Sequence, residues 1–296
     1  MNLFDGLNLT VKENEPLAPL TWLKLGGPVQ WLVEPADEEA LAELLSRCRD
    51  AEVPLHVLGR GANLLVADEG VKGVVVRLSS DVFKTVRIEQ ESIQLGAGAD
   101  LAKIVLDCVR NGRSGLEGLT GIPGTVGGAI KMNAGGQFGD IGSVCRAVRT
   151  LDGAGQILTR RPPELRFGYR RNNLGPGVIV GAELALIEDD PQRIVKRVKE
   201  IWITKRNRQP LDQRSPGCVF KNPPGQHAGQ LIDQAGLKGA ECGGAVVSTK
   251  HANFMIAREG ATSTDMLNLI RKIREKVAEM FQIDIELEIE IWGENV

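Results

Sequence analysis

The sequence predicts a protein of mixed α/β or α+β layers, long enough for one to three domains. Short apolar runs alternate with amphipathic stretches along most of the chain, as they do where strands pack against helices. A chain of 296 residues can bury a large core. Hydrophobic residues at 42% and charged residues at 25% are ordinary values for a folded domain, so they exclude general disorder.

The first elements in chain order are an amphipathic helix and three buried strands. A helix is expected over 36–51, because apolar side chains recur on one stripe and acidic residues crowd the first turn. The stripe consists of Leu41, Leu44, Leu45, Cys48 and Ala51. Short apolar runs predict strands at 54–59, 73–78 and 92–98.

A second helix is expected over 100–111, with Gly112 as its stop. Its apolar stripe consists of Leu101, Ile104, Val105 and Cys108. Further along, the pattern predicts a strand at 181–189 and a helix at 191–207. A domain boundary is expected in or near 190–210.

The C-terminal part begins with a helix and ends with a strand. Thr262 and Asp265 have the spacing of a capping box, which predicts a helix from there to about residue 281. Strict alternation predicts a strand at 283–292, with apolar residues on one face and acids on the other. The acids are Asp284, Glu286, Glu288 and Glu290. Such a face is most often solvated; if it were covered, one carboxylate pKa would rise into the proton-transfer range, and the pattern does not say which.

Composition excludes several classes of protein. The net charge of −2 gives no bulk attraction to nucleic acid or membrane, so an anion site has to be a local pocket. No transmembrane run or signal peptide is expected. The five cysteines are widely spaced and no histidine has metal-ligand spacing, which favours a reducing cytosol without disulfides or a metal.

Glycine is in excess, with 35 residues, and two short glycine motifs follow predicted strands. The segments 59–66 and 96–101 begin like dinucleotide-binding fingerprints, but Leu64 and Leu101 occupy the third glycine position. A phosphate loop and a plain tight turn both remain open for each. The segment 121–136 is more specific, because its glycines and Asn133 can expose backbone N–H groups that suit a pyrophosphate. A glycine-rich crossover is the alternative.

Two further segments carry candidate reactive side chains. In 167–173 the only tyrosine, Tyr169, precedes Arg170, and an arginine can bind a carboxylate or phosphate as a planar fork. The alternative is an ordinary surface arginine. In 215–223, Cys218 stands in a polar turn, which suits a reactive thiol better than a core cysteine. An inert loop thiol is the alternative.

Together these segments resemble the UDP-N-acetylenolpyruvoylglucosamine reductase family, flavoenzymes of peptidoglycan precursor synthesis. The resemblance runs in order over nearly the whole chain. It comprises residues 16–35, 58–66, 118–135, 167–170, 217–223, 231–239, 248–254 and 285–289. The chain is similar to the shorter type of the family, which lacks an extra tyrosine-bearing loop.

The resemblance implies an α+β fold in which a two-subdomain FAD-binding fold of the vanillyl-alcohol-oxidase type is followed by a C-terminal α/β substrate-binding domain. The FAD-binding fold would span about 24–190, with subdomains at 1–80 and 81–190. The substrate-binding domain would span 200–296.

The resemblance also implies the reaction. NADPH, acting as a substrate, reduces FAD, and UDP-N-acetylglucosamine enolpyruvate is then reduced to UDP-N-acetylmuramate. Hydride goes to C3 of the enolpyruvyl group and a proton goes to C2. From the composition we expect a cytoplasmic protein that needs no metal and binds neither nucleic acid nor membrane. The sequence leaves the oligomeric state open, and a monomer is the expectation.

The family motifs assign site residues position by position. The catalytic set is Arg170 as the cation, Cys218 as the proton donor and Glu288 as the carboxylate, with Glu286 as the runner-up for Glu288. Residues implied to hold FAD are Gly59, Arg60, Gly61, Ala62, Asn63, Leu64, Gly121, Ile122, Pro123, Gly124, Thr125, Gly128, Asn133 and Ala134. Residues implied to bind the substrate are Tyr169, Lys205, Lys221, Asn222 and His251.

The chain departs from the family pattern at a few positions. Cys218 stands where the family commonly has serine. A thiol has a pKa of about 8.5, so it is a far stronger acid than an alcohol. The proton-donor role would survive this change, although the pH profile would differ. Arg60 and Ala62 replace the usual small residues, and Gln282 stands where glycine is frequent; none of these departures is expected to abolish function.

Two other functions compete with this one. Another flavin oxidoreductase of the same fold would not need the set of Arg170, Cys218 and Glu288. A nucleotide-binding module without chemistry would need the glycine loops and neither Cys218 nor Glu288.

Overall fold

The chain folds into two compact units, each assembled from segments that are separate in the sequence. The computed structural model describes residues 3–293. Unit 1 comprises Met1–Glu13, Trp31–Arg60 and Gly73–Thr204, and unit 2 comprises Asn14–Gln30, Gly61–Lys72 and Lys205–Val296. Each unit has its own hydrophobic core.

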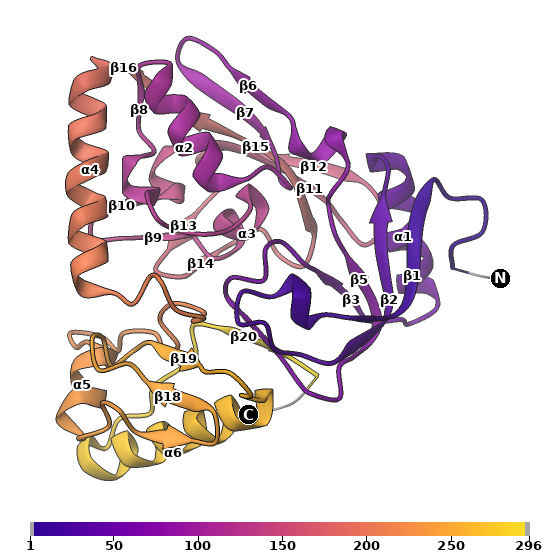
Figure 1. Cartoon of the computed structure of the whole chain (residues 1–296). Helices are drawn as coiled ribbons and strands as arrows, with labels where there is room; N and C mark the ends of the chain where they lie inside the picture. Colours follow the sequence, from indigo (N-terminus) through magenta and orange to yellow (C-terminus); the bar gives the residue numbers. More distant parts are fainter. Residues whose placement is uncertain (1–2, 294–296) are drawn as a thin grey trace. The chain divides into compact units, whose positions relative to one another are not determined.

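A four-stranded sheet and helix α1 form the first layer pair (Figure 1). The strands, in spatial order, are β1 (Leu9–Pro16), β2 (Pro28–Pro35), β5 (Val71–Val76) and β3 (Leu55–Val57). The unit boundaries fall inside β1, β2 and β5. Helix α1 (Glu38–Asp50) starts at Asp37, whose carboxylate accepts a hydrogen bond from the Ala40 N–H at 2.8 Å. Its buried stripe shares one core with Val74 and Val76 of β5.

A five-stranded antiparallel sheet forms the centre of unit 1. Its strands, in spatial order, are β12 (Ile157–Arg160), β11 (Cys145–Leu151), β15 (Val178–Ala185), β7 (Ser92–Gly96) and β6 (Val86–Ile88). Helix α3 (Val126–Lys131) packs on β15 and β7, and α2 (Leu101–Arg110) buries its apolar stripe in the same core. Helix α4 (Pro191–Arg208) is tied to this unit by Arg197, which forms ion pairs with Glu117 and Asp189, both at 2.7 Å.

Three short two-stranded ribbons and three 3-10 turns complete unit 1. The ribbons pair β8 (Arg113–Ser114) with β16 (Ile187–Glu188), β9 (Gly135–Gly136) with β10 (Gly139–Asp140), and β13 (Phe167–Gly168) with β14 (Arg171–Asn172). The turns are η2 (Asp81–Lys84), η3 (Glu117–Leu119) and η4 (Ile141–Val144).

Unit 2 is built on a small sheet, two helices and one parallel strand pair. The sheet contains β17 (Glu241–Cys242), β18 (Ala245–Val247) and β19 (Met255–Ala257). Helix α6 (Ser263–Phe281) packs on β17, β18 and α5 (Ala228–Gln234). The 3-10 turn η1 (Ala18–Leu20) also belongs to unit 2. Strand β4 (Leu64–Val66) pairs in parallel with β20 (Glu290–Trp292). Asp68 accepts hydrogen bonds from the N–H groups of Ser263 and Thr264, both at 2.9 Å, and so ties the β4 segment to α6.

The four predicted helices are confirmed as α1, α2, α4 and α6. The capping box is also confirmed, since the side chains of Thr262 and Asp265 each accept a hydrogen bond from the other's backbone N–H, at 3.1 and 3.0 Å. Gly112, with a φ of 62°, follows the C-cap of α2 as expected.

The predicted strand at 283–292 is wrong in extent, because only 290–292 form a ladder. Residues 286–288 meet 219–221 through single hydrogen bonds and one isolated bridge, so a continuous strand does not form. The alternation of the side chains is nevertheless real: Ile285 and Ile289 are buried, whereas Glu286 is exposed. Helices α3 and α5 were not predicted, and α3 contains two glycines in six residues, which conceals it from propensity rules.

The end of α6 yields a stability prediction. Gln282 closes this helix in the left-handed region, at φ 57° and ψ 34°, where a side chain costs about 1–2 kcal/mol. We expect Gln282→Gly to raise the free energy of unfolding by about 0.5–1 kcal/mol, since glycine loses more entropy on folding but escapes the steric cost. Denaturant unfolding of the variant and the parent measures this difference in the free energy of unfolding. Gln282→Ala, which keeps Cβ, is the control and should give no gain; a glycine variant no more stable than the parent contradicts the argument.

Candidate active site

In unit 1, two glycine loops lie against each other, the one that begins at Gly59 and the one in the 121–136 segment. A Cβ added to Gly59 would lie 2.7 Å from Oγ1 of Thr125, so only glycine permits this approach. The same Oγ1 accepts a hydrogen bond from the Gly128 N–H at 3.3 Å and caps α3. Asp100, which caps α2, pairs with Thr125 in an isolated antiparallel bridge. The start of α2 therefore borders both loops.

These loops have the donors and the room that a pyrophosphate requires. The backbone N–H groups of Gly59, Arg60 and Gly124 donate to no acceptor within residues 3–293. A Cβ added to Gly124 would meet nothing within 4 Å, so the space in front of this residue is open. Unpaired N–H groups beside a helix N-terminus favour an anion. The residues present thus fit the pyrophosphate of FAD.

Arg170 lies at the turn of the β13–β14 hairpin, beside the end of the 121–136 segment. Its guanidinium donates to the carbonyl of Gly135 at 3.0 Å and to that of Asn133 at 3.4 Å. The guanidinium carbon lies 5.2 Å from the centre of the Tyr169 ring, in cation–π contact. Two motifs that are separate in the sequence, 121–136 and 167–173, therefore form one surface of unit 1.

Asn133 has a structural role that the sequence did not reveal. The residue is 3% exposed, and its side chain donates to the Gly168 carbonyl at 2.9 Å and accepts from the Gly142 N–H at 2.9 Å. The amide thus positions the Arg170 hairpin. Its φ of 43° suits an asparagine, because asparagine tolerates the left-handed region better than most residues.

The other residues predicted to hold FAD differ in how far they are buried. The Leu64 side chain is 5% exposed, so a contact from this residue would come from its backbone. Gly121, Ile122, Pro123 and Ala134, in the 121–136 segment, are partly exposed.

In unit 2, the peptide group of Glu288 is held from both sides. Its N–H donates to the carbonyl of Val219, the neighbour of Cys218, at 2.8 Å. Its carbonyl accepts from the Asn63 side-chain amide at 3.0 Å. The structure therefore brings together three predicted site residues, Asn63, Cys218 and Glu288.

Burial distinguishes the two candidate glutamates. Glu286 has a side chain that is 77% exposed, and it forms a 3.1 Å ion pair with Lys221. Glu288 is half-buried. A catalytic carboxylate is better placed in partly desolvated surroundings, which favours Glu288 over Glu286.

A buried amide that the sequence reasoning missed fixes the Cys218 segment. Asn253 is 2% exposed; its Oδ1 accepts from the Phe220 N–H at 2.9 Å and its Nδ2 donates to the Phe220 carbonyl at 2.7 Å. The Asn253 carbonyl also accepts from the Val219 N–H at 2.9 Å. Its place in the 248–254 motif was the available signal.

The predicted substrate-binding residues of unit 2 have varied surroundings. Burial lowers the pKa of Lys205 to about 8. Burial also lowers the pKa of His251, whose Nδ1 accepts from the Asn253 N–H at 3.3 Å and whose ring stands edge-on to Phe254 at 4.8 Å. Asn222 accepts from the Ala228 N–H at 3.0 Å and so fixes the start of α5.

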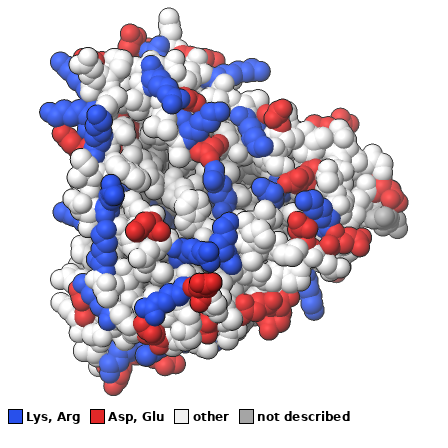
Figure 2. Space-filling view, viewed as in Figure 1, with Lys and Arg blue, Asp and Glu red and all other residues white. Residues whose placement is uncertain are grey.

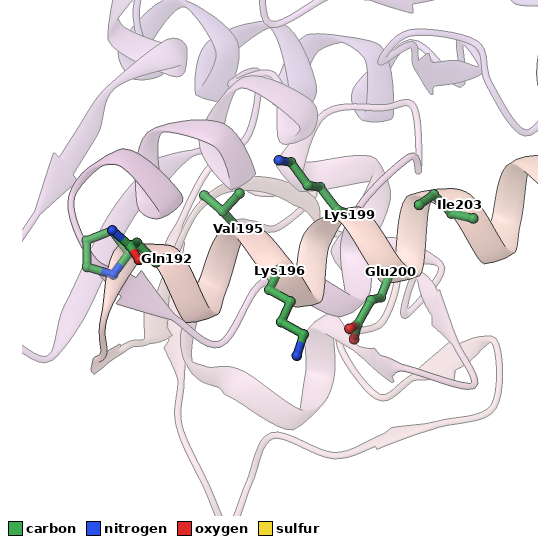
Figure 3. Close-up of a pocket in the computed structure, with 7 residues that line it drawn as sticks. Gln192, Val195, Lys196, Lys199, Glu200 and Ile203 are labelled. Carbon is green, nitrogen blue, oxygen red and sulfur yellow. The ribbon is translucent and has the colours of Figure 1, made fainter.

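Two surface depressions lie in unit 1. One of about 480 Å³ is lined only by the outer face of α4, where Val195 and Lys199 point to one side and Lys196 and Glu200 to the other (Figure 3). It contains no predicted site residue. The other, of about 430 Å³, borders the Arg170 hairpin, with Asn133 and Tyr169 among its lining residues.

Neither the charges on one face of the molecule nor the His, Cys, Asp and Glu residues of the described part of the chain point to a competing site. Basic and acidic side chains are interspersed on the face drawn in Figure 2. Across residues 3–293, no cluster of three or more His, Cys, Asp or Glu is placed to hold a metal ion. Over the same residues, no helix is both long and apolar enough to cross a bilayer.

Two family models match the chain. Residues 29–160 match the FAD binding domain, and residues 209–292 match the C-terminal domain of UDP-N-acetylenolpyruvoylglucosamine reductase. With the glycine loops, the first match defines a flavoprotein and confirms the expectation of FAD. A berberine bridge enzyme variant described as a reticuline dehydrogenase shares the fold, with a TM-score of 0.50 and 15% identity over 64% of this chain and 42% of that chain. The predicted α+β fold of the vanillyl-alcohol-oxidase type is thereby confirmed.

Close relatives cover the full length. The UDP-N-acetylenolpyruvoylglucosamine reductase of Moorella thermoacetica is 44% identical over 99% of this chain and 97% of its own length. The crystal structure of the corresponding enzyme from Thermus caldophilus superposes with a TM-score of 0.83 at 40% identity, covering 97% of this chain and all of that one. The chain belongs to the UDP-N-acetylenolpyruvoylglucosamine reductase family, and it is an oxidoreductase.

The glycine loops yield a cofactor-binding prediction. Gly128 is exposed, and a Cβ there would make only an ordinary 3.5 Å contact with Oγ1 of Thr125. We expect Gly128→Val to fold normally but to lose about tenfold or more in FAD affinity, because its side chain fills the space in front of the loop. Flavin absorbance of the purified protein and its circular dichroism measure the two effects. Gly136→Val, where an added Cβ meets nothing within 4 Å, is the matched control. Stoichiometric FAD in the Gly128 variant contradicts the assignment.

Proposed function

We propose that the chain reduces UDP-N-acetylglucosamine enolpyruvate to UDP-N-acetylmuramate with NADPH. The observation that carries this proposal is the Glu288 peptide group, held between Asn63 of the predicted cofactor loop and Val219 beside the predicted proton donor. The Glu288 carboxyl group and the Cys218 thiol, close to the predicted cofactor loop, suit the addition of a hydride and a proton across a double bond. The glycine loops would hold FAD, and FAD would supply the hydride-transfer chemistry that links NADPH to C3 of the enolpyruvyl group.

Arg170 is proposed to stabilise the negative charge that develops on the enolpyruvyl carboxylate. Its guanidinium is oriented in advance by the carbonyls of Gly135 and Asn133, so little reorganisation is needed when charge appears. A planar fork matches a carboxylate in two-point contact, which a lysine does not reproduce. Tyr169 supports the guanidinium from its ring face.

Cys218 is proposed to donate the proton to C2, with Glu288 as the carboxylate partner in the site. The thiol proton moves to carbon, the thiolate remains, and water restores its proton before the next turnover. The half-buried position of both side chains limits competition from bulk water. Residues proposed to bind the substrate are Tyr169, Lys205, Lys221, Asn222 and His251.

The proposal extends to domain roles and location. Residues 1–80 and 81–190 would hold FAD, and residues 200–296 would bind the substrate. A cytoplasmic monomer, binding neither nucleic acid nor membrane, is proposed; five free thiols favour a reducing compartment and a net charge of −2 gives no bulk attraction to polyanions.

An anaerobic experiment separates this function from its alternatives. The purified yellow protein should be bleached by NADPH and re-oxidised by UDP-N-acetylglucosamine enolpyruvate. Bleaching without re-oxidation would indicate another flavin oxidoreductase. A protein that binds nucleotide but never bleaches would indicate a module without chemistry.

Cys218 yields the sharpest mechanistic prediction. Cys218→Ser should retain substantial activity, and Cys218→Ala should lose about 10²–10⁴ in turnover, the usual contribution of a general acid. The alanine variant should still be bleached by NADPH, because that half-reaction needs no acid here. Single-turnover re-oxidation and steady-state rates measure both effects. Cys242→Ala, which changes another partly exposed thiol, is the control. An alanine variant within about threefold of the parent in both assays removes Cys218 from the mechanism.

The pKa of Lys205 yields a pH prediction for substrate binding. Because burial lowers this pKa to about 8, the ammonium is present below pH 8 and disappears above it. If it binds the substrate diphosphate, the dissociation constant should rise by up to about tenfold per pH unit above pH 8. Flavin spectral titration of the oxidised enzyme measures binding without proton donation. In Lys205→Arg the rise should be absent up to pH 10, and a parent profile flat from pH 7 to 10 refutes the role.

A further inference from the structure

A carboxylate stands where an anionic cofactor is expected to bind. Asp100 caps α2 by accepting a hydrogen bond from the Lys103 N–H at 3.0 Å. Its backbone pairs with Thr125, and the next N–H, that of Leu101, donates to the Gly124 carbonyl at 3.1 Å. The negative charge of Asp100 therefore lies next to the loop that fits a pyrophosphate. It would repel a pyrophosphate bound there.

Arg60 compensates this charge from the other glycine loop. Its guanidinium forms an ion pair with the Asp100 carboxylate. The two side chains are 48% and 33% exposed, so neither is deeply desolvated. Arg60 directly follows Gly59, where an added Cβ would clash with Thr125, and so the ion pair spans the same two loops.

We propose that Arg60 and Asp100 form a charge-compensating pair that sets the FAD affinity of this site. Asp100 supplies the cap that orders the start of α2, and Arg60 cancels its charge so that the loops accept a pyrophosphate. Both are positioning residues, since they act through the charge at the loops and not on the reacting atoms. The inference rests on the FAD site described above.

Four variants separate this role from simpler ones. Arg60→Ala leaves the carboxylate uncompensated, whereas Arg60→Lys keeps a cation. Asp100→Ser keeps a capping oxygen without the charge. The double variant Arg60→Ala/Asp100→Ser removes both charges together. If Arg60 instead contacts FAD directly, the second substitution cannot restore what the first removes.

The test measures how tightly FAD binds to the flavin-free protein. The quenching of flavin fluorescence reports binding, at low and at high salt. We expect Arg60→Ala to weaken FAD binding by about tenfold at low salt and less at high salt, because a half-exposed charge is screened. Arg60→Lys should bind within about threefold of the parent, which is within the size of a weak surface ion pair. Asp100→Ser should bind as tightly as the parent or more tightly, and the double variant should return to within about threefold of it.

Three results overturn the inference. An Arg60→Ala affinity equal to that of the parent shows that the pair does not affect FAD. A double variant as weak as Arg60→Ala shows direct contact with the cofactor. An Asp100→Ser variant as weak as Arg60→Ala shows that the ion pair acts only by joining the loops. A parent protein that binds no FAD would refute the FAD site itself, which is a separate failure.

Discussion

The parallel pairing of β4 with β20 is the constraint on which the candidate site of unit 2 depends. Leu64 lies opposite Glu290, so two segments from distant parts of the chain run in the same direction and in register. Residues that precede parallel strands emerge at the same end of the pair. Asn63 precedes one strand and Glu288 precedes the other, and they form a hydrogen bond although they are 225 positions apart in the sequence. The backbone pairing thus makes a predicted cofactor loop and a predicted catalytic acid neighbours, and the Asn63 side chain joins them.

In unit 1, hydrogen bonds from side-chain amides position the hairpin that carries Arg170. Arg170 adopts a φ of 52°, a conformation that costs about 1–2 kcal/mol for a residue with a side chain. Asn133 donates to the Gly168 carbonyl at 2.9 Å, and Asn172 donates to the Lys131 carbonyl at 2.7 Å. Each such bond contributes about 0.5–1.5 kcal/mol, so together they offset the strained turn. The hairpin is therefore fixed before any ligand arrives, and its guanidinium is oriented with it.

The sequence predicted what depends on local pattern and missed what depends on distant partners. The four long helices were found because apolar periodicity and caps are local signals. The strand over 283–292 was overextended because alternation reports which side chains are buried, and not whether a neighbour completes the ladder. Helix α3 was missed because packing on β15 and β7, and not propensity, stabilises a segment with two glycines. The motif pointed to Asn133, but its bonds to Gly168 and Gly142 required the fold. The interleaved units, with 14–30 and 61–72 grouped apart from their neighbours, had no signal in composition.

The main chain also accounts for how a thiol can occupy position 218. Phe254 pairs with Cys218 in an isolated bridge, and the Asn253 carbonyl accepts from the next N–H at 2.9 Å. The Asn253 amide holds both polar groups of the Phe220 backbone. All these contacts involve the backbone of 218–220, so none depends on the side chain of residue 218. These backbone contacts are the same for serine and for cysteine, so they fix the position of Cβ at residue 218, while the two side chains differ in acidity.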